Sequence, residues 1–527
     1  MESAPVYIDG VRGVQIAQGD IRYDQSKEQY ATSSYKDENR MSPALIVHPI
    51  SKEDISLTLK YAKAQKIAVA VRTGGHQYCG ASSTLAPNIQ LDLRSSFKGP
   101  NDRRIFNSSD GKKTYAYTSV SWSLGEFNAW LGHTDNQVFV PHGQCTTVHL
   151  GGHVQTGGYG QLGRSFGLFG DHVVIIEYVD HNGDFKEVTR DSDPEIFYAI
   201  LGGSPGNFGV ITHLTIEVYR DKDYVGSRGL KTWYVYRKDT LERLLTLLAT
   251  MSDDPEFPRN YDFCITVLSS SFHLPYIFPK LETEDLNKAE YPELFDKDGK
   301  RLSGWPRVIV VYAQWVPFSP TDRPNDQWFR DIAKGAVGIH HQAKVKPMSQ
   351  LTSEWIFRGS REFKHPYHKR TQLTNSTTLV KDKWPEWLAG RIHKLVAPLN
   401  GCYLSAQIQS YGGKHSKFIT NANNGTAYSW REDTTICCVL DVFYKDQKAL
   451  KTAIEWHNTN EAEGIGSNGI FCKQDRRVLW GSFGDFNLDA VWHTYFETEE
   501  KYERLRAARR KADPDGVFTP NTFSVKR

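Results

Sequence analysis

The sequence predicts an α+β protein of two domains, and three observations support this fold class. The chain has 527 residues, which is more than one hydrophobic core usually spans. Across the first 220 residues, helical and extended patterns alternate and are separated by glycine-rich turns. From about residue 225 to 475, longer helices alternate with aromatic strands. We therefore expect one domain over residues 1–220, a second over 221–476 and a C-terminal segment over 477–527.

Local signals define the elements of the first domain. Ser51 precedes Asp54 and apolar residues at helical spacing, which predicts a capped helix to about Ala64. Ser123 and Glu126 predict the start of a second capped helix in the same way. The pair at 182–183, Asn-Gly, predicts a hairpin. A further helix is expected at 193–201, and strands are expected at 67–72, 89–93, 114–121, 173–179 and 210–219.

In the second domain, runs rich in β-branched and aromatic residues predict strands at 308–315, 402–411 and 435–443. The C-terminal segment contains an expected helix at 499–511. That helix is ended by the turn Asp-Pro-Asp-Gly at 513–516, and a short extended tail follows it.

Charge and hydrophobicity exclude several classes of protein. Lys and Arg together number 64 and Asp and Glu 61, and the basic residues are scattered, so binding to nucleic acid is not expected. No stretch of 18 apolar residues occurs, so no membrane partner is expected either. Aromatic residues make up 12% of the chain, which is typical of a folded protein. These features favour a small-molecule substrate.

Seven cysteines bear on metal binding and on the compartment. They are widely spread and include no CxxC pair, so no metal site is expected. Their odd number favours a reducing compartment, and residues 1–13 lack the basic and apolar regions of a signal peptide, so a cytoplasmic location is expected. Three glycosylation sequons, at Asn107, Asn375 and Asn424, instead favour secretion if a signal peptide has been removed.

A glycine-rich turn follows the expected strand at 67–72. Its residues Arg72, Thr73, Gly74, Gly75, His76 and Gln77 join a strand end, two glycines and a histidine. Backbone N–H groups in such a turn can approach an anionic phosphate closely. The turn is therefore a candidate pyrophosphate cradle, and the alternative is an ordinary loop histidine on a tight turn.

A second glycine-rich segment surrounds Cys145. Seven glycines fall within the 21 residues from 143 to 163, which indicates backbone packed against a large flat or phosphorylated ligand. The alternative for Cys145 is a buried, inert thiol. Residues 158–163 match GxGxxG, but no strand precedes them directly, so a Rossmann site for NAD(P) is not expected.

Four motifs together carry a family resemblance: RTGGH at 72–76, GQCTTV at 143–148, GGSPGNFGVIT at 202–212 and DPDGVFTPNTF at 513–523. In this order they resemble the FAD-linked oxidases of the berberine bridge enzyme-like family, which has a PCMH-type FAD-binding domain and belongs to the vanillyl-alcohol oxidase superfamily. The similarity runs from about residue 40 to 523, and a fungal member is expected. It implies that 1–220 is the FAD domain, completed by 477–527, and that 221–476 is a substrate domain with an antiparallel sheet covered by helices.

The resemblance also implies roles for single residues. His76 would be joined to the 8α-methyl of the flavin and Cys145 to its ring carbon 6, since an imidazole and a thiolate are suitable nucleophiles. Two such links are expected to raise the reduction potential of the flavin. Val148, three residues after the cysteine, would leave a path for dioxygen. The remaining implied cofactor contacts are Arg72, Thr73, Gly74, Gly75, Gln77, Gly151, Gly152, Gly157, Gly158, Asn207, Gly209, Val210 and Asn521.

The catalytic base is where the sequence departs from the family. Several relatives place a tyrosine at the position of Phe483, and phenylalanine cannot accept a proton. A second family position, which carries Glu or Gln in many members, falls on Asp441, and this residue is our first candidate. Gln409 and Tyr411 are further candidates. They lie on the strand at 402–411, where Tyr403, Ser405, Gln407, Gln409 and Tyr411 share one face.

The implied activity is an FAD-dependent oxidase. It would remove a hydride from a small organic substrate, a secondary metabolite or a carbohydrate, and pass the electrons to O2 as H2O2. The alternatives are a flavin dehydrogenase with another electron acceptor and a catalytically inactive flavin-binding protein. The sequence does not distinguish among sugars, phenols, alkaloids and polyketides as substrates.

Overall fold

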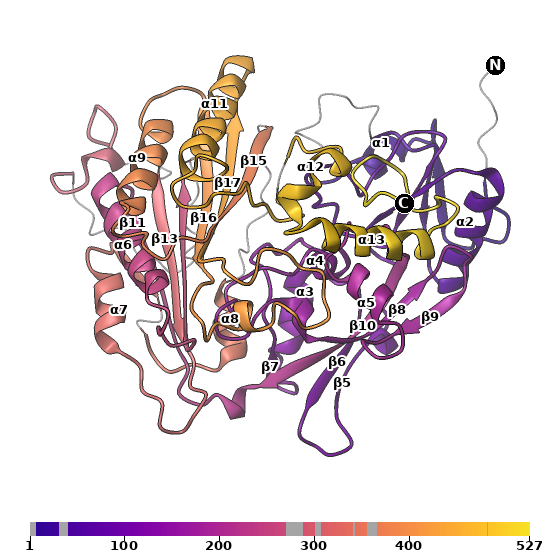
Figure 1. The fold of residues 1–527 in the computed structure, drawn as a ribbon, viewed down its shortest axis with the longest axis horizontal. Helices are drawn as coiled ribbons and strands as arrows, with labels where there is room; N and C mark the ends of the chain where they lie inside the picture. The colour runs from indigo at the N-terminus through magenta and orange to yellow at the C-terminus, as the bar shows by residue number, and fades with distance from the viewer. Residues whose placement is uncertain are drawn as a thin grey trace.

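Two blocks of secondary structure lie side by side, one built on two smaller sheets and the other on a single large sheet (Figure 1). The computed structural model describes residues 7–30, 41–269, 288–300, 307–340, 343–355, 366–481 and 483–527. The α+β class, the two-domain fold and the large antiparallel sheet covered by helices are confirmed.

The first block holds a four-stranded and a six-stranded sheet. The four-stranded sheet has the order β1 (Val14–Ala17), β2 (Leu45–His48), β4 (Ile89–Asp92) and β3 (Val69–Arg72), in which the last three strands are parallel. The six-stranded sheet is antiparallel and has the order β5 (Arg103–Asn107), β6 (Thr114–Ser119), β10 (Val210–Arg220), β8 (Val173–Val179) and β9 (Phe185–Val188), with β7 (Val138–Phe139) beside β10.

Capping side chains begin the helices of this block where the sequence predicts them. Helix α2 (Lys52–Gln65) starts at Ser51, whose hydroxyl accepts a hydrogen bond from the Asp54 N–H. Helix α3 (Leu124–Leu131) has a full capping box of Ser123 and Glu126. Helix α5 (Pro194–Ile200) and the β8–β9 hairpin are also confirmed. A short helix in the second glycine-rich segment, α4 (Leu150–Gln155), was not predicted. Two of its six residues are glycines, which disfavour helices.

The second block is a seven-stranded, wholly antiparallel sheet. Its order is β14 (Gly338–His340), β11 (Arg228–Val235), β13 (Val308–Trp315), β12 (Tyr261–Leu268), β16 (Cys402–Ser410), β17 (Ile436–Tyr444) and β15 (Tyr367–Thr374). The predicted strands β13, β16 and β17 are confirmed within one residue at each end.

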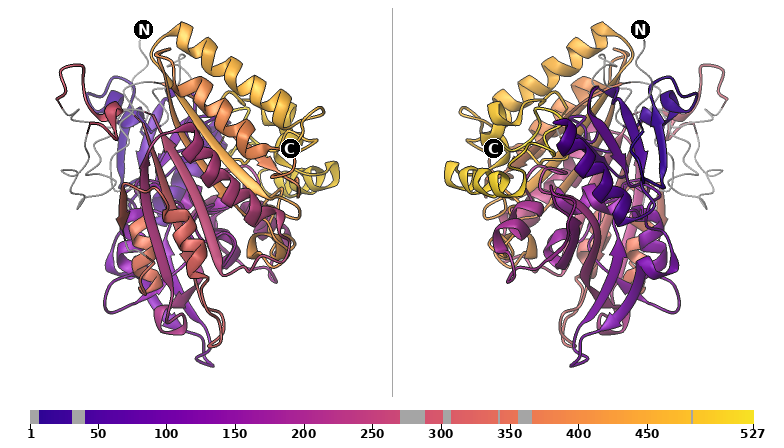
Figure 2. Two further views of the ribbon diagram at one scale, coloured as in Figure 1. Left: turned by 90° about the vertical axis from the view of Figure 1, so that its left-hand side faces the viewer. Right: turned by 90° about the vertical axis from the view of Figure 1, so that its right-hand side faces the viewer.

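Three helices cover one face of this sheet, as Figure 2 shows: α6 (Lys238–Asp253), α9 (Trp384–Val396) and α11 (Gln447–Gly464). Every second residue of β16 and β17, including Leu404, Ala406, Leu440 and Val442, packs in the apolar core beneath these helices. The intervening residues face the first block. Helices α7 (Asp326–Ala333) and α8 (Met348–Trp355) complete the block.

The C-terminal segment packs on the first block (Figure 1). It contains α12 (Leu488–Tyr495) and α13 (Glu499–Ala512), followed by an extended tail. The Val69 N–H at the start of β3 donates to the Val517 carbonyl at 2.7 Å, and the buried Arg509 guanidinium donates to the Phe518 carbonyl at 2.8 Å. Among the described residues, no helix is both long and apolar enough to span a bilayer.

Candidate active site

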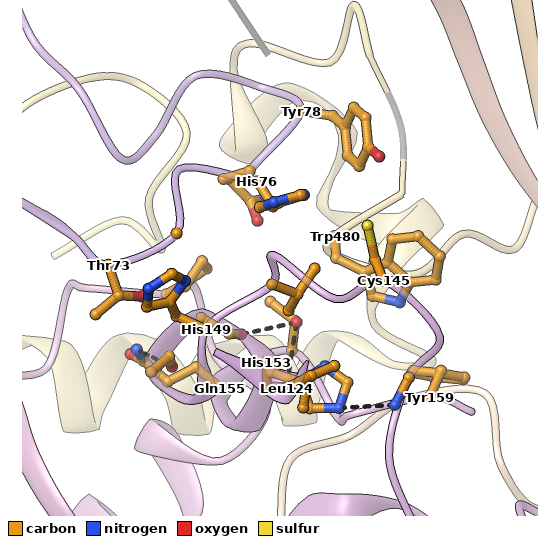
Figure 3. Close-up of a pocket in the computed structure, with 18 of the residues that line it drawn as sticks. Thr73, His76, Tyr78, Leu124, Cys145, His149, His153, Gln155, Tyr159 and Trp480 are labelled. Atoms are coloured by element: carbon orange, nitrogen blue, oxygen red, sulfur yellow. Dashed lines mark hydrogen bonds between the residues drawn. The ribbon is translucent and has the colours of Figure 1, made fainter. Parts of the chain in front are cut away.

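A large cavity lies between the two blocks. Its first-block wall comes from both glycine-rich segments and from the start of β10, and its second-block wall is the uncovered face of the large sheet. Figure 3 shows His76 and Cys145 on two different loops that border this space. Trp480 of the C-terminal segment also lines the cavity, so the structure brings together residues that are more than 300 positions apart in the sequence.

His76 and Cys145 converge on the hydroxyl of Thr147. The Thr147 Oγ1 atom lies 3.1 Å from His76 Nε2 and 4.0 Å from Cys145 Sγ. The ring of Tyr30 stacks on the His76 imidazole, with centroids 3.9 Å apart. Both side chains are half-buried, and both residues line the cavity. This arrangement is suited to two covalent links to one flat ligand.

The floor of the cavity is bare backbone at two glycines. A Cβ added at Gly152 would have no atom within 4 Å, and one added at Gly206, where φ is +77°, would meet only Val71. Gln155 joins these two segments, because its Nε2 donates to the Gly151 carbonyl at 2.9 Å and its Oε1 accepts from the Gly206 N–H at 2.8 Å. The space over exposed peptide groups fits a large phosphorylated cofactor such as FAD.

Two histidines of the cavity wall are held neutral. Burial lowers the pKa of His149 to about 4 and that of His153 to about 3. His153 Nε2 accepts a hydrogen bond from the Gly143 N–H at 3.2 Å, which requires that nitrogen to be unprotonated. The wall beside the cysteine loop is therefore polar but uncharged at neutral pH.

The opposite wall consists of side chains in register across four strands. Asp441 of β17 pairs with Ser405 of β16 on one side and with Lys369 of β15 on the other. In the next row, Val439 pairs with Gln407, which pairs with Thr266 of β12. All of these residues line the cavity. The polar face predicted for the strand at 402–411 is therefore a pocket wall, although Tyr403 is not among the lining residues.

Asp441 forms a buried ion pair with Lys369. The Lys369 Nζ atom lies 2.8 Å from Asp441 Oδ1 and donates a hydrogen bond to Oδ2 at 3.0 Å. The side chains of the two residues are 2% and 6% exposed, so the pair is desolvated and each partner depends on the other. The ammonium also lies 4.0 Å from the ring centroid of Tyr78 and 5.0 Å from that of Trp480.

Gln409 and Tyr411 anchor the wall to the second glycine-rich segment. The Gln409 amide donates to the Gly160 carbonyl, and the Tyr411 hydroxyl donates to Gln409 Oε1 at 3.2 Å. Burial raises the pKa of Tyr411 well above its usual value, so its phenolate is disfavoured. Tyr411 is therefore a weak candidate for the base, although both residues line the cavity.

Phe483 does not line the cavity. Its ring packs against Tyr367 and Phe486, with centroids 6.2 and 5.4 Å apart, in an aromatic cluster beside the site. The position where the sequence comparison predicts a tyrosine in several relatives therefore does not border the cavity, whereas Trp480 and Lys369 do.

Many of the residues predicted to contact the cofactor line the cavity together. They are Thr73, Gly74, Gly75, His76, Gln77, Cys145, Val148, Gly151, Gly152 and Gly209. Six others are not among the lining residues: Arg72, Gly157, Gly158, Asn207, Val210 and Asn521. For these six, side-chain contact with the cofactor stays a prediction.

The side chains of three of these six residues are engaged by other parts of the first block and the C-terminal segment. The buried Arg72 guanidinium is paired with Asp92 at 2.6 Å. The Asn207 amide donates to the Phe518 carbonyl at 2.6 Å. The Asn521 amide donates to the Ser83 carbonyl at 3.2 Å. These side chains tie the cofactor loops to the rest of the first block.

Several residues that line the cavity were not predicted from the sequence, and Lys369 is the most important of them. It lies in the run Tyr367–Thr374, whose polar composition did not predict a strand. Strict alternation along this run would have placed Lys369 on the face of Tyr367 and Thr371. His149, His153, Gln155 and Trp480 were also not predicted to line the site.

The sequence of this chain is similar to those of known proteins. Residues 43–189 match the model of the FAD binding domain family. The chain is 35% identical to berberine bridge enzyme-like 18 of Arabidopsis thaliana over 170 residues, which is 32% of this chain and 30% of that protein. It is 33% identical to berberine bridge enzyme-like 5 of the same plant over 321 residues, 57% of this chain and 59% of that protein. The match thus spans about a third of the first relative's length.

Solved structures share the fold over nearly the whole chain. Chitooligosaccharide oxidase superposes with a TM-score of 0.71 at 15% identity, covering 98% of this chain and 97% of that one. The 6-hydroxy-D-nicotine oxidase of Arthrobacter nicotinovorans superposes with a TM-score of 0.69 at 17% identity, covering 100% and 99%.

Residues 43–189 therefore form an FAD binding domain, and nearly the whole chain shares the fold of these two solved oxidases. The chain is similar to berberine bridge enzyme-like proteins over part of its length, and the rest of the likeness is a shared fold.

Proposed function

We propose that the protein is an FAD-dependent oxidase that removes a hydride from a small organic substrate and passes the electrons to dioxygen. The observation that carries the proposal is the convergence of His76 and Cys145 on one hydroxyl at the edge of the cavity. Two nucleophilic side chains at this spacing, over a bare glycine floor, support an FAD attached through both. The facing wall of polar strand residues supports a substrate site directly opposite.

The chain's own residues would hold the cofactor and the substrate in fixed positions. Bound FAD would supply hydride acceptance and return of two electrons to dioxygen, giving hydrogen peroxide. His76 and Cys145 would fix the ring system, and the Gln155 amide holds the two glycine segments beneath it. Gln407 and Ser405, on the opposite strand, offer hydrogen bonds that orient a substrate C–H bond toward the cofactor.

Asp441 is the favoured acceptor of the substrate proton. It lines the cavity, and the raised pKa of Tyr411 makes the tyrosine a poor base. Lys369 holds the carboxylate in one orientation, and a proton reaching Asp441 would leave a neutral acid beside an ammonium. The pair therefore acts as a unit, in which Lys369 is a positioning residue for the carboxylate.

The change Asp441→Asn is expected to lower kcat by about 10²–10⁴-fold while the flavin content stays unchanged. The amide keeps an acceptor for Lys369 but cannot take a proton. Single-turnover flavin bleaching measures this loss apart from reoxidation. Asp433→Asn, which changes a carboxylate bound by Arg476 outside the cavity, is the control and should retain most of the rate. Full activity of a folded Asp441→Asn protein would eliminate Asp441 as the base.

Val148 is relevant to whether the protein acts as an oxidase or as a dehydrogenase. It lines the cavity between the cysteine loop and α4, where it is half-buried. Protein reduced without oxygen should reoxidise rapidly when mixed with air-saturated buffer in a stopped-flow instrument. Val148→Leu is expected to slow that step by roughly tenfold or more, because its added methylene extends into the cavity and narrows the path for dioxygen. Val148→Ala should stay fast. Slow reoxidation of the unmodified protein would favour the dehydrogenase alternative.

A substrate screen tests the function itself. The panel would contain oligosaccharides, phenols and alkaloids, since solved structures with this fold are named for oxidases of chitooligosaccharides and of 6-hydroxy-D-nicotine. The proposal expects that at least one class bleaches the flavin and releases hydrogen peroxide. If no compound reduces the flavin while dithionite does, the inactive flavin-binding alternative is favoured.

A further inference from the structure

A second cavity lies outside the candidate active site, where both blocks contribute residues. The first block supplies Lys113, Ser165, Phe166, Asp171, His172, Val174, Arg190, Glu217 and Tyr219, and the later chain supplies Tyr224, Arg259, Phe318, Lys417, Asn421 and Asn424. None of these residues lines the first cavity. Four of them are Lys or Arg and two are Asp or Glu.

Both acidic residues of this cavity are already paired. The two Nη atoms of the buried Arg431 guanidinium donate to the Asp171 carboxylate at 2.7 and 2.8 Å. Glu217 is paired with Lys113 at 2.8 Å. Asp171 also accepts hydrogen bonds from the Asn421 and Asn424 amides. The acids are therefore not available to neutralise the remaining cations.

Among the described residues, three cations of this cavity have no carboxylate partner. Arg259 and Lys417 form no ion pair within 4.0 Å and donate no side-chain hydrogen bond in the part of the chain that the structure describes. Arg190 donates to the Asp171 carbonyl at 3.1 Å, but its buried Nε atom has no acceptor among the described residues. Burial and the neighbouring Arg259 both lower the pKa of Lys417, as expected for like charges held together.

Aromatic rings form the rest of the wall. The rings of Phe166, Tyr219, Tyr224 and Phe318 contact one another, with centroids between 4.8 and 6.1 Å apart. The Arg259 guanidinium lies 3.9 Å from the Phe318 centroid, stacked over the ring. A cationic pocket with an aromatic wall suits a ligand that has a charged head and a flat body.

We propose that this cavity is a binding site for a phosphate monoester that carries a ring. Arg190, Arg259 and Lys417 would bind the phosphate, and the ring would rest against Tyr219, Tyr224 and Phe318. Three unpaired cations favour a dianion over a monoanion, and a phosphate monoester is close to a dianion at pH 7. The site does not depend on the flavin chemistry of the first cavity.

The test is calorimetric titration of the flavin-containing protein with phenyl phosphate, inorganic phosphate and benzoate at low ionic strength. Phenyl phosphate is expected to bind most tightly, because inorganic phosphate lacks the ring and benzoate carries only one charge. The double change Arg259→Gln and Lys417→Gln is expected to weaken phenyl phosphate binding by at least about tenfold. Added salt should weaken binding to the unmodified protein as well.

Lys414→Gln is the matched control, because Lys414 is exposed, is paired with Glu256 and lies outside the cavity. It should leave the affinity unchanged. If the double variant does not fold, Lys417→Gln alone serves, since Lys417 is only half-buried. The proposal is overturned if phenyl phosphate does not bind, if it binds equally well after these changes, or if benzoate binds more tightly.

Discussion

Replacing Arg431 with leucine is expected to lower the free energy of unfolding by about 3–5 kcal/mol, because it leaves the buried Asp171 carboxylate without its cation. The side chains of both partners are only 1% exposed. Burial by itself would raise the pKa of Asp171, but Arg431 and the hydrogen bonds around the carboxylate lower it overall. The pair joins the segment before β17 to the end of the second glycine-rich segment, so its loss should also loosen the cofactor side of the site.

Urea unfolding at neutral pH measures this loss. Arg504→Leu is the control, because Arg504 makes an equally short ion pair with Glu195, at 2.8 Å, but both side chains are almost half exposed. An exposed pair of this kind contributes at most about 1 kcal/mol. If the two variants lose the same stability, burial is not what makes the Asp171–Arg431 pair important.

Acidification from pH 7.5 to pH 5 is expected to destabilise the protein through its buried histidines. Burial lowers the folded-state pKa of His153 and His368 to about 3 and that of His149 to about 4, whereas all three titrate near 6.5 when unfolded. As the pH falls below about 6.5, the unfolded chain therefore binds protons that the folded chain does not. Each histidine removes about 2 kcal/mol by pH 5.

Asp262 opposes part of this effect. Burial raises its folded-state pKa to about 6, so the folded state gains a proton there first and recovers about 1 kcal/mol at pH 5. A variant isolates one histidine. His153→Gln keeps an acceptor for the Gly143 N–H and should lose about 2 kcal/mol less than the unmodified protein over this range. An equal dependence in the unmodified protein and in the variant would contradict the assignment.

Much of the fold could be predicted because its signals are local. The caps at Ser51 and Ser123, the hairpin at 182–183 and the strands of alternating residues each depend on neighbours a few positions away. The strand at 402–411 shows the limit. Alternation predicted which residues share a face, but only the packing of α6 and α9 on the other side makes that face a pocket wall.

Site residues could be predicted where a sequence motif indicates their chemistry. They could not be predicted where tertiary packing determines which way the side chain points. His76 and Cys145 stand out by residue type and glycine context, and both line the cavity. Arg72 belongs to the same motif, yet its side chain turns inward to Asp92, which no local pattern reveals. Lys369 was not predicted because its role depends on an ion pair with Asp441 on the neighbouring strand, which is 72 residues away in the sequence.

The most direct test of the account is flavin fluorescence in the protein band of a denaturing gel. Unmodified protein, His76→Ala, Cys145→Ala and the double variant would be compared at equal loading. We expect fluorescence with the unmodified protein and with each single variant, and none with the double variant, because either link alone retains the flavin. Release of all flavin from the unmodified protein on denaturation would contradict attachment through His76 and Cys145.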